Sequence, residues 1–178
     1  MAQEKSSERS MPDEPSGRQL TGLRILVTRP RDQARNLCRL IEEAGGRALA
    51  IPALEIRAIA DPEPARALVD RLEEFDLAVF ISANAVEHGH RLVSARGGWP
   101  ARLKLAVVGK RSAEALVRHG LYADICPTQA YNSEALLAEE QMWQVAGKKI
   151  IIFRGEGGRE LLARTLKERG ASVYYAEV

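Results

Sequence analysis

The feature of this sequence that most constrains its fold is a regular alternation of short apolar runs with segments of helical periodicity. The runs are rich in Val, Ile and other strand-forming residues, and each is bounded by turn residues. Strand–helix alternation predicts parallel pairing through helical crossovers, and therefore an α/β fold with both faces of the sheet covered. The runs predicted as strands are Ile25–Thr28, Ala48–Ile59, Leu77–Ser82, Leu105–Val108, Ala123–Cys126, Ile150–Phe153 and Val173–Val178.

The segments between these runs carry apolar residues at helical spacing. In the first segment Leu37, Leu40 and Ile41 recur three and four residues apart, and Gly45–Gly46 supplies the stop. The predicted helices are Asp32–Ala44, Pro64–Glu73, Ala83–Ser94, Lys110–His119, Asn132–Val145 and Gly158–Arg169.

Three segments depart from this alternation. Residues 1–20 contain only four hydrophobic residues, which predicts a disordered tail. Residues 47–64 are extended and contain Pro52, which cannot donate to a ladder, so they form an edge strand, a linker between domains or a surface loop within one domain. Only one strand–helix unit precedes them, and Val173–Val178 is a strand that nothing follows. We therefore expect this chain to be a truncated protein.

Charge and cysteine usage exclude several classes of protein. Lys and Arg number 26 against 24 for Asp and Glu, which is too weak an excess to indicate a nucleic-acid partner. No apolar run approaches the roughly 20 residues that span a bilayer, and the N-terminus lacks a signal-peptide core. The two cysteines, Cys38 and Cys126, lie far apart, which argues against a disulfide framework or structural zinc. These features predict a cytoplasmic protein.

Four strand–helix junctions carry the candidate binding residues. They begin at Thr28, Ser82, Gly109 and Arg154, at the edge of an α/β sheet where ligands bind. Each offers free backbone N–H groups at a helix N-terminus, where anions bind. Cations at this position oppose the helix dipole, so stability alone does not select them. The six cations are Arg29, Arg31, Lys110, Arg111, Arg154 and Arg159. The pattern indicates a polyanionic small molecule, although each junction taken singly also fits an ordinary N-cap or turn.

Sharper motifs are incomplete. The loop RGEGGRE suggests a dinucleotide site, but the G-x-G-x-x-G fingerprint needs glycine where Glu160 stands. A nucleotide-binding domain therefore stays a third interpretation. His88 and His90 are two residues apart, so on a helix they lie on different faces and predict a solvated surface rather than a metal pair.

Five blocks of the sequence, taken in order, resemble the uroporphyrinogen-III synthase family. The first is RILVTRPRDQARNLCRLIEEAGGRALAIPALEI, and the others are FISANAVEH, AVVGKRSAEAL, YNSEALL and AGKKIIIFRGEGGRELLARTLKERGASV. The resemblance covers Leu23 to Val178. Departures are Ile81, where the family often has Thr, and Ser112, where it also often has Thr.

The resemblance implies two flavodoxin-like parallel-sheet lobes joined by a two-stranded ladder, with the first lobe incomplete in this chain. Residues 21–46 would be the strand and helix of lobe 1, residues 47–60 the outgoing linker strand, residues 61–171 lobe 2, and residues 172–178 the returning linker strand.

The family's reaction is cyclisation of linear hydroxymethylbilane to uroporphyrinogen III, with inversion of the terminal pyrrole ring and loss of water. The resemblance implies a monomeric hydro-lyase of haem biosynthesis that needs no cofactor or metal and binds a linear tetrapyrrole. Its candidate general acid, a Tyr, falls immediately after Val178, so no catalytic residue is assigned, and neither Tyr174 nor Tyr175 matches it by register. The residues that match cleft positions are Thr28, Arg29, Ser82, Asn84, Gly109, Ser112, Arg154, Gly155 and Arg159.

Two functions follow from this resemblance. The first is the synthase itself, with this chain a poorly active fragment. The alternative is a non-catalytic, synthase-like module that binds or regulates through the same ligand.

Overall fold

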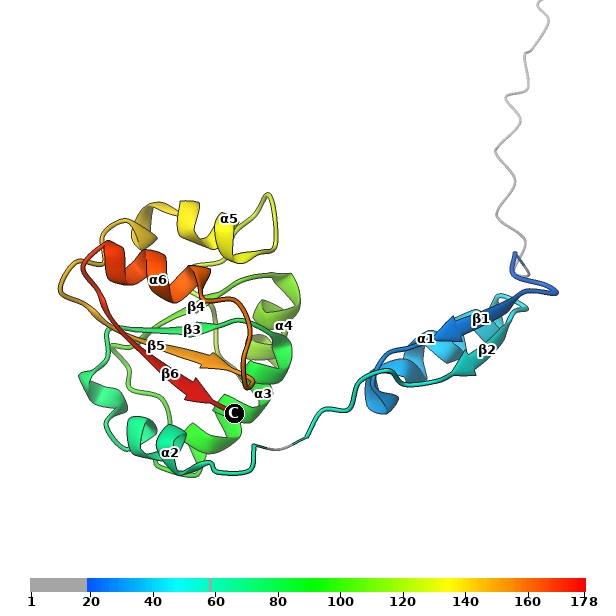
Figure 1. Ribbon diagram of the computed structural model, residues 1–178, viewed down its shortest axis with the longest axis horizontal. Coiled ribbons are helices and arrows are strands. Elements are labelled where there is room, and N and C mark those ends of the chain that lie inside the picture. The colour runs from blue at the N-terminus through cyan, green and yellow to red at the C-terminus, as the bar shows by residue number, and fades with distance from the viewer. Residues whose placement is uncertain (1–18, 58) are drawn as a thin grey trace, which may run out of the picture. The chain divides into compact units, whose positions relative to one another are not determined.

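Residues 19–57 and 59–178 are described by the computed structural model, and the chain divides into two units, Met1–Arg57 and Ala58–Val178 (Figure 1). The predicted tail lies outside the described residues apart from Gln19 and Leu20. Leu20 was predicted to belong to the tail but is part of the folded first unit. Its N–H donates to the Ala44 carbonyl at 2.9 Å, and its side chain packs on the core of that unit.

Residues 19–57 of the first unit form two strands and one helix. Strand β1 (Arg24–Val27) leads into helix α1 (Arg31–Glu43), and the chain returns as β2 (Arg47–Ala50), which pairs with β1 in parallel. Its buried core is small and consists of Val27, Ala34 and Ile41. A two-stranded sheet is marginal by itself, so this unit has little independent stability.

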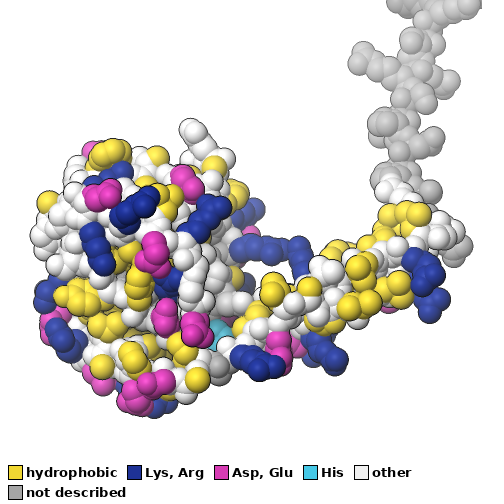
Figure 2. Space-filling model, in the orientation of Figure 1, with side chains coloured by type: hydrophobic (Ala, Val, Ile, Leu, Met, Phe, Trp, Pro, Cys, Tyr) yellow, Lys and Arg dark blue, Asp and Glu magenta, His cyan; other side chains and the backbone are white. Residues whose placement is uncertain are grey.

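Large apolar side chains remain exposed on the first unit, and Figure 2 shows hydrophobic side chains gathered along it. Leu54 is 72% exposed and Ile51 is 62% exposed, although neither has a polar atom in its side chain. An apolar surface of this kind usually marks an interface. The other exposed members are Leu23, Leu26, Leu40 and Ile56.

The second unit is built on a parallel four-stranded sheet with the strand order β4-β3-β5-β6. Its strands are β3 (Leu77–Phe80), β4 (Lys104–Val107), β5 (Lys149–Arg154) and β6 (Ser172–Glu177). Its α-helices are α2 (Glu63–Val69), α3 (Ala83–Ser94), α4 (Lys110–Arg118), α5 (Ser133–Ala138) and α6 (Leu161–Glu168), with short 3-10 turns η1 (Leu72–Glu74) and η2 (Glu140–Met142).

Two cores sandwich this sheet because alternate strand residues face opposite sides. Phe80 and Phe153 stack at 4.9 Å in the core that α2, α3 and α4 cover. Val79 and Ile152 face the core beneath α5 and α6. Figure 1 shows α5 and α6 on one side of the sheet and α2 on the other. The predicted α/β fold with parallel sheets is confirmed.

Three of the predicted strands are shorter in the structure, and one of these, Leu77–Ser82, ends at Phe80. The Ala48–Ile59 run forms a strand only as far as Ala50, and its last bond to the β1 segment joins the Ala53 N–H to the Thr28 carbonyl at 3.0 Å. Pro52 has no N–H to extend the ladder. The Ala123–Cys126 run makes one isolated bridge, between Ile125 and Ala106, because the Asp124 carboxylate takes the Leu105 N–H that a longer ladder would use.

Elsewhere the structure divides a predicted helix and pairs the last predicted strand with the sheet. The Asn132–Val145 helix breaks at Glu139, whose backbone is extended, and only α5 and η2 remain helical. Within residues 172–178, predicted as the returning linker strand, residues 172–177 form β6 and pair with β5. Val173 and Tyr175 pack against the core under α6.

Candidate functional site

Three of the four predicted junctions meet at one edge of the second unit's sheet. Phe80 of β3 is in register with Val107 of β4 on one side and with Phe153 of β5 on the other, so the three strands end level. The turns that follow them lead into α3, α4 and α6. The structure therefore brings together the predicted site residues Ser82, Asn84, Gly109, Ser112, Arg154, Gly155 and Arg159.

The β3–α3 junction is built around a helix cap. The Ser82 Oγ accepts a hydrogen bond from the Ala85 N–H at 3.0 Å, which satisfies one of the free donors at the start of α3. Asn84 is half-buried in the first turn of the same helix. Ser82 thus has a structural role whether or not it also contacts a ligand.

The β4–α4 junction requires glycine for space rather than for its backbone angles. Gly109 is extended, but a Cβ at this position would lie 2.9 Å from the Cβ of Tyr131. This close approach holds the loop before α5 against the start of α4. Ser112 is only 3% exposed, so its contact with a ligand stays a prediction that the buried position does not favour. Lys110 and Arg111, in contrast, are exposed on the first turn of α4.

The β5–α6 junction holds a buried charge. The Arg154 side chain is 4% exposed, and its guanidinium donates to the Glu160 carboxylate at 2.9 Å and to the Gly155 carbonyl at 3.2 Å. The guanidinium also lies over the Tyr175 ring, 4.5 Å from the ring centroid. From the sequence we expected Arg154 to be free to bind a substrate carboxylate. In the structure its guanidinium is already paired with Glu160 and does not face solvent.

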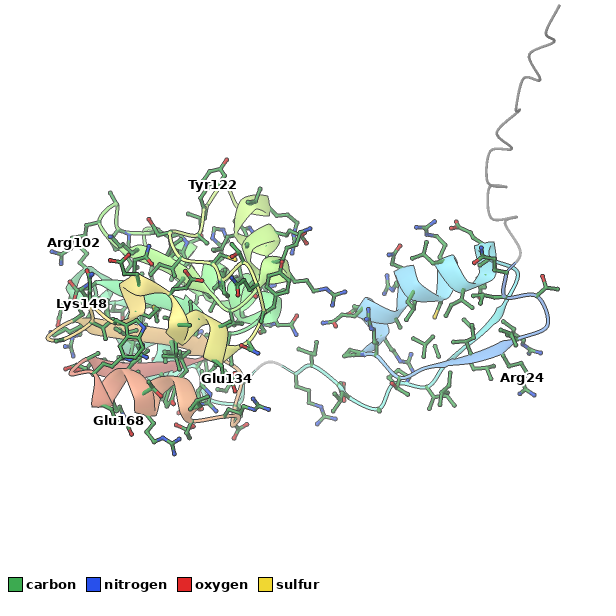
Figure 3. All side chains as sticks on the ribbon, turned by 90° about the horizontal axis from the view of Figure 1, so that it is seen from above. Arg24, Arg102, Tyr122, Glu134, Lys148 and Glu168 are labelled. Atoms are coloured by element: carbon green, nitrogen blue, oxygen red, sulfur yellow. The ribbon has the colours of Figure 1, made fainter. Side chains whose placement is uncertain are left out.

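The two remaining residues of this junction are open to solvent. Gly155 and Arg159 are exposed, and Arg159 makes a surface ion pair of 3.3 Å with Glu134. In Figure 3 Glu134 lies at one end of the second unit, and Arg102 and Lys148 lie at the opposite end. A pair this exposed contributes little to stability, so Arg159 can exchange Glu134 for another carboxylate at low cost.

Sequence reasoning missed Glu160 and Tyr175, which complete the surroundings of Arg154. The Tyr175 hydroxyl donates to the second Glu160 oxygen at 2.5 Å. Burial and this hydrogen bond raise the pKa of Tyr175 to about 12. Hydrogen bonds from Tyr175 and Arg154 lower the pKa of Glu160. The alternation along β6 could have placed Tyr175 on one face of the sheet, but no sequence pattern identifies its partner.

The fourth junction belongs to the first unit. Thr28 and Arg29 are exposed between β1 and α1, and the helix begins after Pro30 without a side-chain cap. The Thr28 carbonyl accepts from the Ala53 N–H. Their arrangement as the turn after a parallel strand matches that of the other three junctions.

One cavity of the second unit lies away from these junctions. This cavity of about 230 Å³ opens at the amino ends of β3 and β4, where it is lined by Leu77, Lys104 and Lys148. Within residues 19–57 and 59–178, no helix is long and apolar enough to cross a membrane. In the same ranges no group of three or more His, Cys, Asp or Glu side chains is placed to hold a metal ion.

The prediction of a solvated His88–His90 surface is only partly right. His90 is half-buried, accepts a hydrogen bond at Nδ1 from the Trp99 indole at 3.2 Å, and stacks on His119 with ring centroids 4.0 Å apart. His119 in turn contacts the Glu87 carboxylate at 2.7 Å. These contacts join α3 to the end of α4, and they give His90 a structural role.

Comparison with known proteins identifies relatives that match most of this chain. Residues 35–178 match the family model described as uroporphyrinogen-III synthase HemD. A putative uroporphyrinogen-III synthase from Methanothermobacter thermautotrophicus is 38% identical over 154 residues, which are 86% of this chain and 60% of that protein. The uroporphyrinogen-III synthase of Proteus mirabilis is 33% identical over 150 residues, which are 84% of this chain and 75% of that protein.

A solved structure shares the fold. It is a mutant uroporphyrinogen III synthase from the extremely thermophilic bacterium Thermus thermophilus, which superposes with a TM-score of 0.65 at 20% identity and covers 88% of this chain. The chain spans 61% of that structure, close to its 60% share of the Methanothermobacter protein.

Proposed function

Because the chain belongs to the uroporphyrinogen-III synthase family, we propose that it is part of a synthase that cyclises hydroxymethylbilane to uroporphyrinogen III. The reaction inverts the terminal pyrrole ring and releases water. In this proposal the second unit forms one wall of the substrate site, and no cofactor or metal takes part.

The observation that carries this proposal is the edge where β3, β4 and β5 end together. Lys110, Arg111 and Arg159 are exposed there, beside the N-termini of three helices. The substrate carries eight carboxylates, and both cations and helix N-termini bind carboxylates.

The chemical task also fits such a surface. Ring closure requires the two ends of a flexible chain to meet, so holding the bilane folded supplies a large share of the rate acceleration. Ser82, Gly109 and Gly155 would present backbone N–H groups to the carboxylates, and Arg159 would orient them.

The reaction also needs a proton donor for the departing hydroxyl, and none is assigned among the described residues. Tyr175 lies beside Arg154 at this edge, but burial and the hydrogen bond to Glu160 raise its pKa to about 12, which makes it a poor acid. We therefore propose that Tyr175 does not supply this proton.

This same observation favours the alternative function, a ligand-binding module without turnover. Such a module would keep the carboxylate-binding edge and would not need a proton donor. The two functions share a ligand and differ only in product formation.

The experiment measures binding and turnover separately. Saturable binding of uroporphyrin III, a stable octacarboxylate, is expected by fluorescence titration, and a porphyrin with four carboxylates should bind more weakly. Hydroxymethylbilane is then supplied, and the type I and type III isomers are separated by chromatography. Absence of saturable binding would refute both functions. Binding with type III formation supports the synthase, and binding without it supports the module.

We further propose a cytoplasmic location and a monomeric state for the chain. Cys38 and Cys126 are both free thiols, as a reducing compartment allows.

A further inference from the structure

Glu160 holds the buried guanidinium of Arg154 from the solvent side. Arg154 is nearly sealed, whereas the Glu160 side chain is 64% exposed. One Glu160 oxygen accepts from Arg154 and the other accepts from the Tyr175 hydroxyl. The carboxylate therefore sits in a two-donor cradle whose walls are Arg154 and Tyr175 and whose mouth faces water.

The segment that carries Glu160 is loosely packed. It follows a glycine-rich loop, and a Cβ placed at Gly155 or Gly157 would meet no atom within 4 Å. Gly158 is the exception: its φ is +108°, and a Cβ there would lie 3.2 Å from the Arg154 guanidinium. Glu160 is also the N-cap residue of α6, yet its side chain makes no cap hydrogen bond to that helix. The loop is therefore free to carry Glu160 away from Arg154.

Removing the carboxylate without replacement would leave a buried charge uncompensated, which is strongly unfavourable. Exchanging it for another carboxylate avoids that penalty, because the guanidinium and the phenol keep their hydrogen bonds and Glu160 returns to water. The cradle is thus suited to exchange carboxylates rather than to stand empty.

We infer that Glu160 is an internal occupant of a carboxylate-binding subsite formed by Arg154 and Tyr175, and that a carboxylate of the substrate replaces it. This inference rests on the proposed function, since it takes the ligand to be a polycarboxylate. Glu160 then acts as a competitor that keeps the subsite closed until a ligand with the same chemistry arrives.

A purely structural role for the cluster predicts the opposite response to mutation. If Glu160 only fixes the loop, weakening its contacts loosens the binding edge and lowers affinity for anions. If Glu160 competes with the ligand, weakening its contacts raises affinity. The sign of the change separates the two roles.

The test uses the 178-residue chain and propane-1,2,3-tricarboxylate at constant ionic strength, with binding followed by calorimetry. Glu160→Gln preserves the shape of the side chain and weakens it as a competitor. We expect the affinity to rise about tenfold, which corresponds to a subsite open in about one-tenth of the unaltered molecules.

Glu168→Gln is the matched control. Glu168 is the last residue of α6, and its side chain is 66% exposed. Its substitution changes the net charge by the same amount. The affinity of the Glu168→Gln variant for the tricarboxylate should stay within about twofold of that of the unaltered chain. This comparison measures how much the loss of one negative charge changes affinity at long range. Adding Tyr175→Phe to Glu160→Gln should cancel part of the gain, because the ligand then loses a donor.

An unchanged or reduced affinity in Glu160→Gln, relative to Glu168→Gln, overturns the inference. A second measurement needs no mutation: saturating the unaltered chain with the tricarboxylate should shift the Glu160 carboxyl ¹³C resonance and leave that of Glu168 in place. A stationary Glu160 resonance at saturation overturns it equally. Neither readout depends on turnover, so the proposed function and the subsite can fail separately.

Discussion

Arg154 ends β5 and Arg159 lies in the loop after it, and their different surroundings predict that only the alanine variant of Arg154 loses stability as well as affinity. Arg154 is buried under Glu160 and against Tyr175, whereas the Arg159 side chain is 79% exposed. The sequence alone gives both residues the same role. The structure predicts that Arg154→Ala lowers stability in addition to affinity, and that Arg159→Ala lowers affinity alone.

The magnitude for Arg154 follows from its burial. Arg154→Ala removes a cation–π contact and two hydrogen bonds, and it leaves a void between β5 and β6. Relief of the desolvation of the guanidinium offsets part of this loss. We expect a net loss of about 2–3 kcal/mol in the free energy of unfolding. For a unit of this size, that corresponds to a fall in Tm of about 10 °C.

The magnitude for Arg159 is smaller and lies elsewhere. Its exposed pair with Glu134 contributes at most about 0.5 kcal/mol to stability. A charge-assisted hydrogen bond to a ligand carboxylate, discounted for solvent, should contribute about 1 kcal/mol, or about fivefold in affinity for uroporphyrin III. Arg164→Ala, one turn further along α6, should change neither quantity.

Urea unfolding monitored by circular dichroism gives the first quantity, and porphyrin fluorescence titration gives the second. The reasoning is refuted if Arg154→Ala leaves the unfolding midpoint unchanged, or if Arg159→Ala destabilises the chain more than Arg154→Ala does. Equal losses of affinity in Arg159→Ala and Arg164→Ala would remove Arg159 from the site.

Two further predictions concern stability. Burial, together with the charge of His119, lowers the pKa of His90, so the unfolded chain takes up a proton before the folded chain does. The free energy of unfolding should be complete above the ordinary histidine pKa of about 6.5 and should fall as the pH drops through the lower pKa of folded His90. Urea titrations between about pH 7.5 and 5 should show this slope, reduced in His90→Gln and kept in His88→Gln. Amides of β1 and β2 should exchange with solvent about a hundredfold faster than those of β3 and β5, because their core contains only three buried side chains. Comparable protection of the two sets of amides in hydrogen-exchange mass spectrometry would contradict the prediction that the first unit has little independent stability.

The sequence predicted elements best where local signals agreed. Helix α3 was predicted with the bounds that it has, because Ser82 caps it and its apolar residues recur at helical spacing. The parallel sheet followed from the alternation of strand and helix. The apolar runs Leu77–Ser82 and Ile150–Phe153 were predicted as strands, and they form β3 and β5, which are buried on both faces.

The errors came from contacts between distant residues, or from a single residue that interrupts a pattern. Asp124 takes a backbone donor of β4, and an apolar pattern gives no sign of that hydrogen bond. Glu139 breaks a run of residues that otherwise favour a helix. In the site, the pairing of Arg154 with Glu160 and Tyr175 depends on a turn whose path sequence does not specify.

The central claim is that the edge where β3, β4 and β5 end binds a polycarboxylate tetrapyrrole. Its most direct test is a titration of the ¹⁵N-labelled chain with uroporphyrin III, with amide shifts followed residue by residue. The account predicts the largest changes at Ser82, Gly109 and Gly155, and little change at Leu77, Lys104 and Lys149 at the opposite strand ends. Changes confined to those opposite ends, or no saturable change at all, would contradict it.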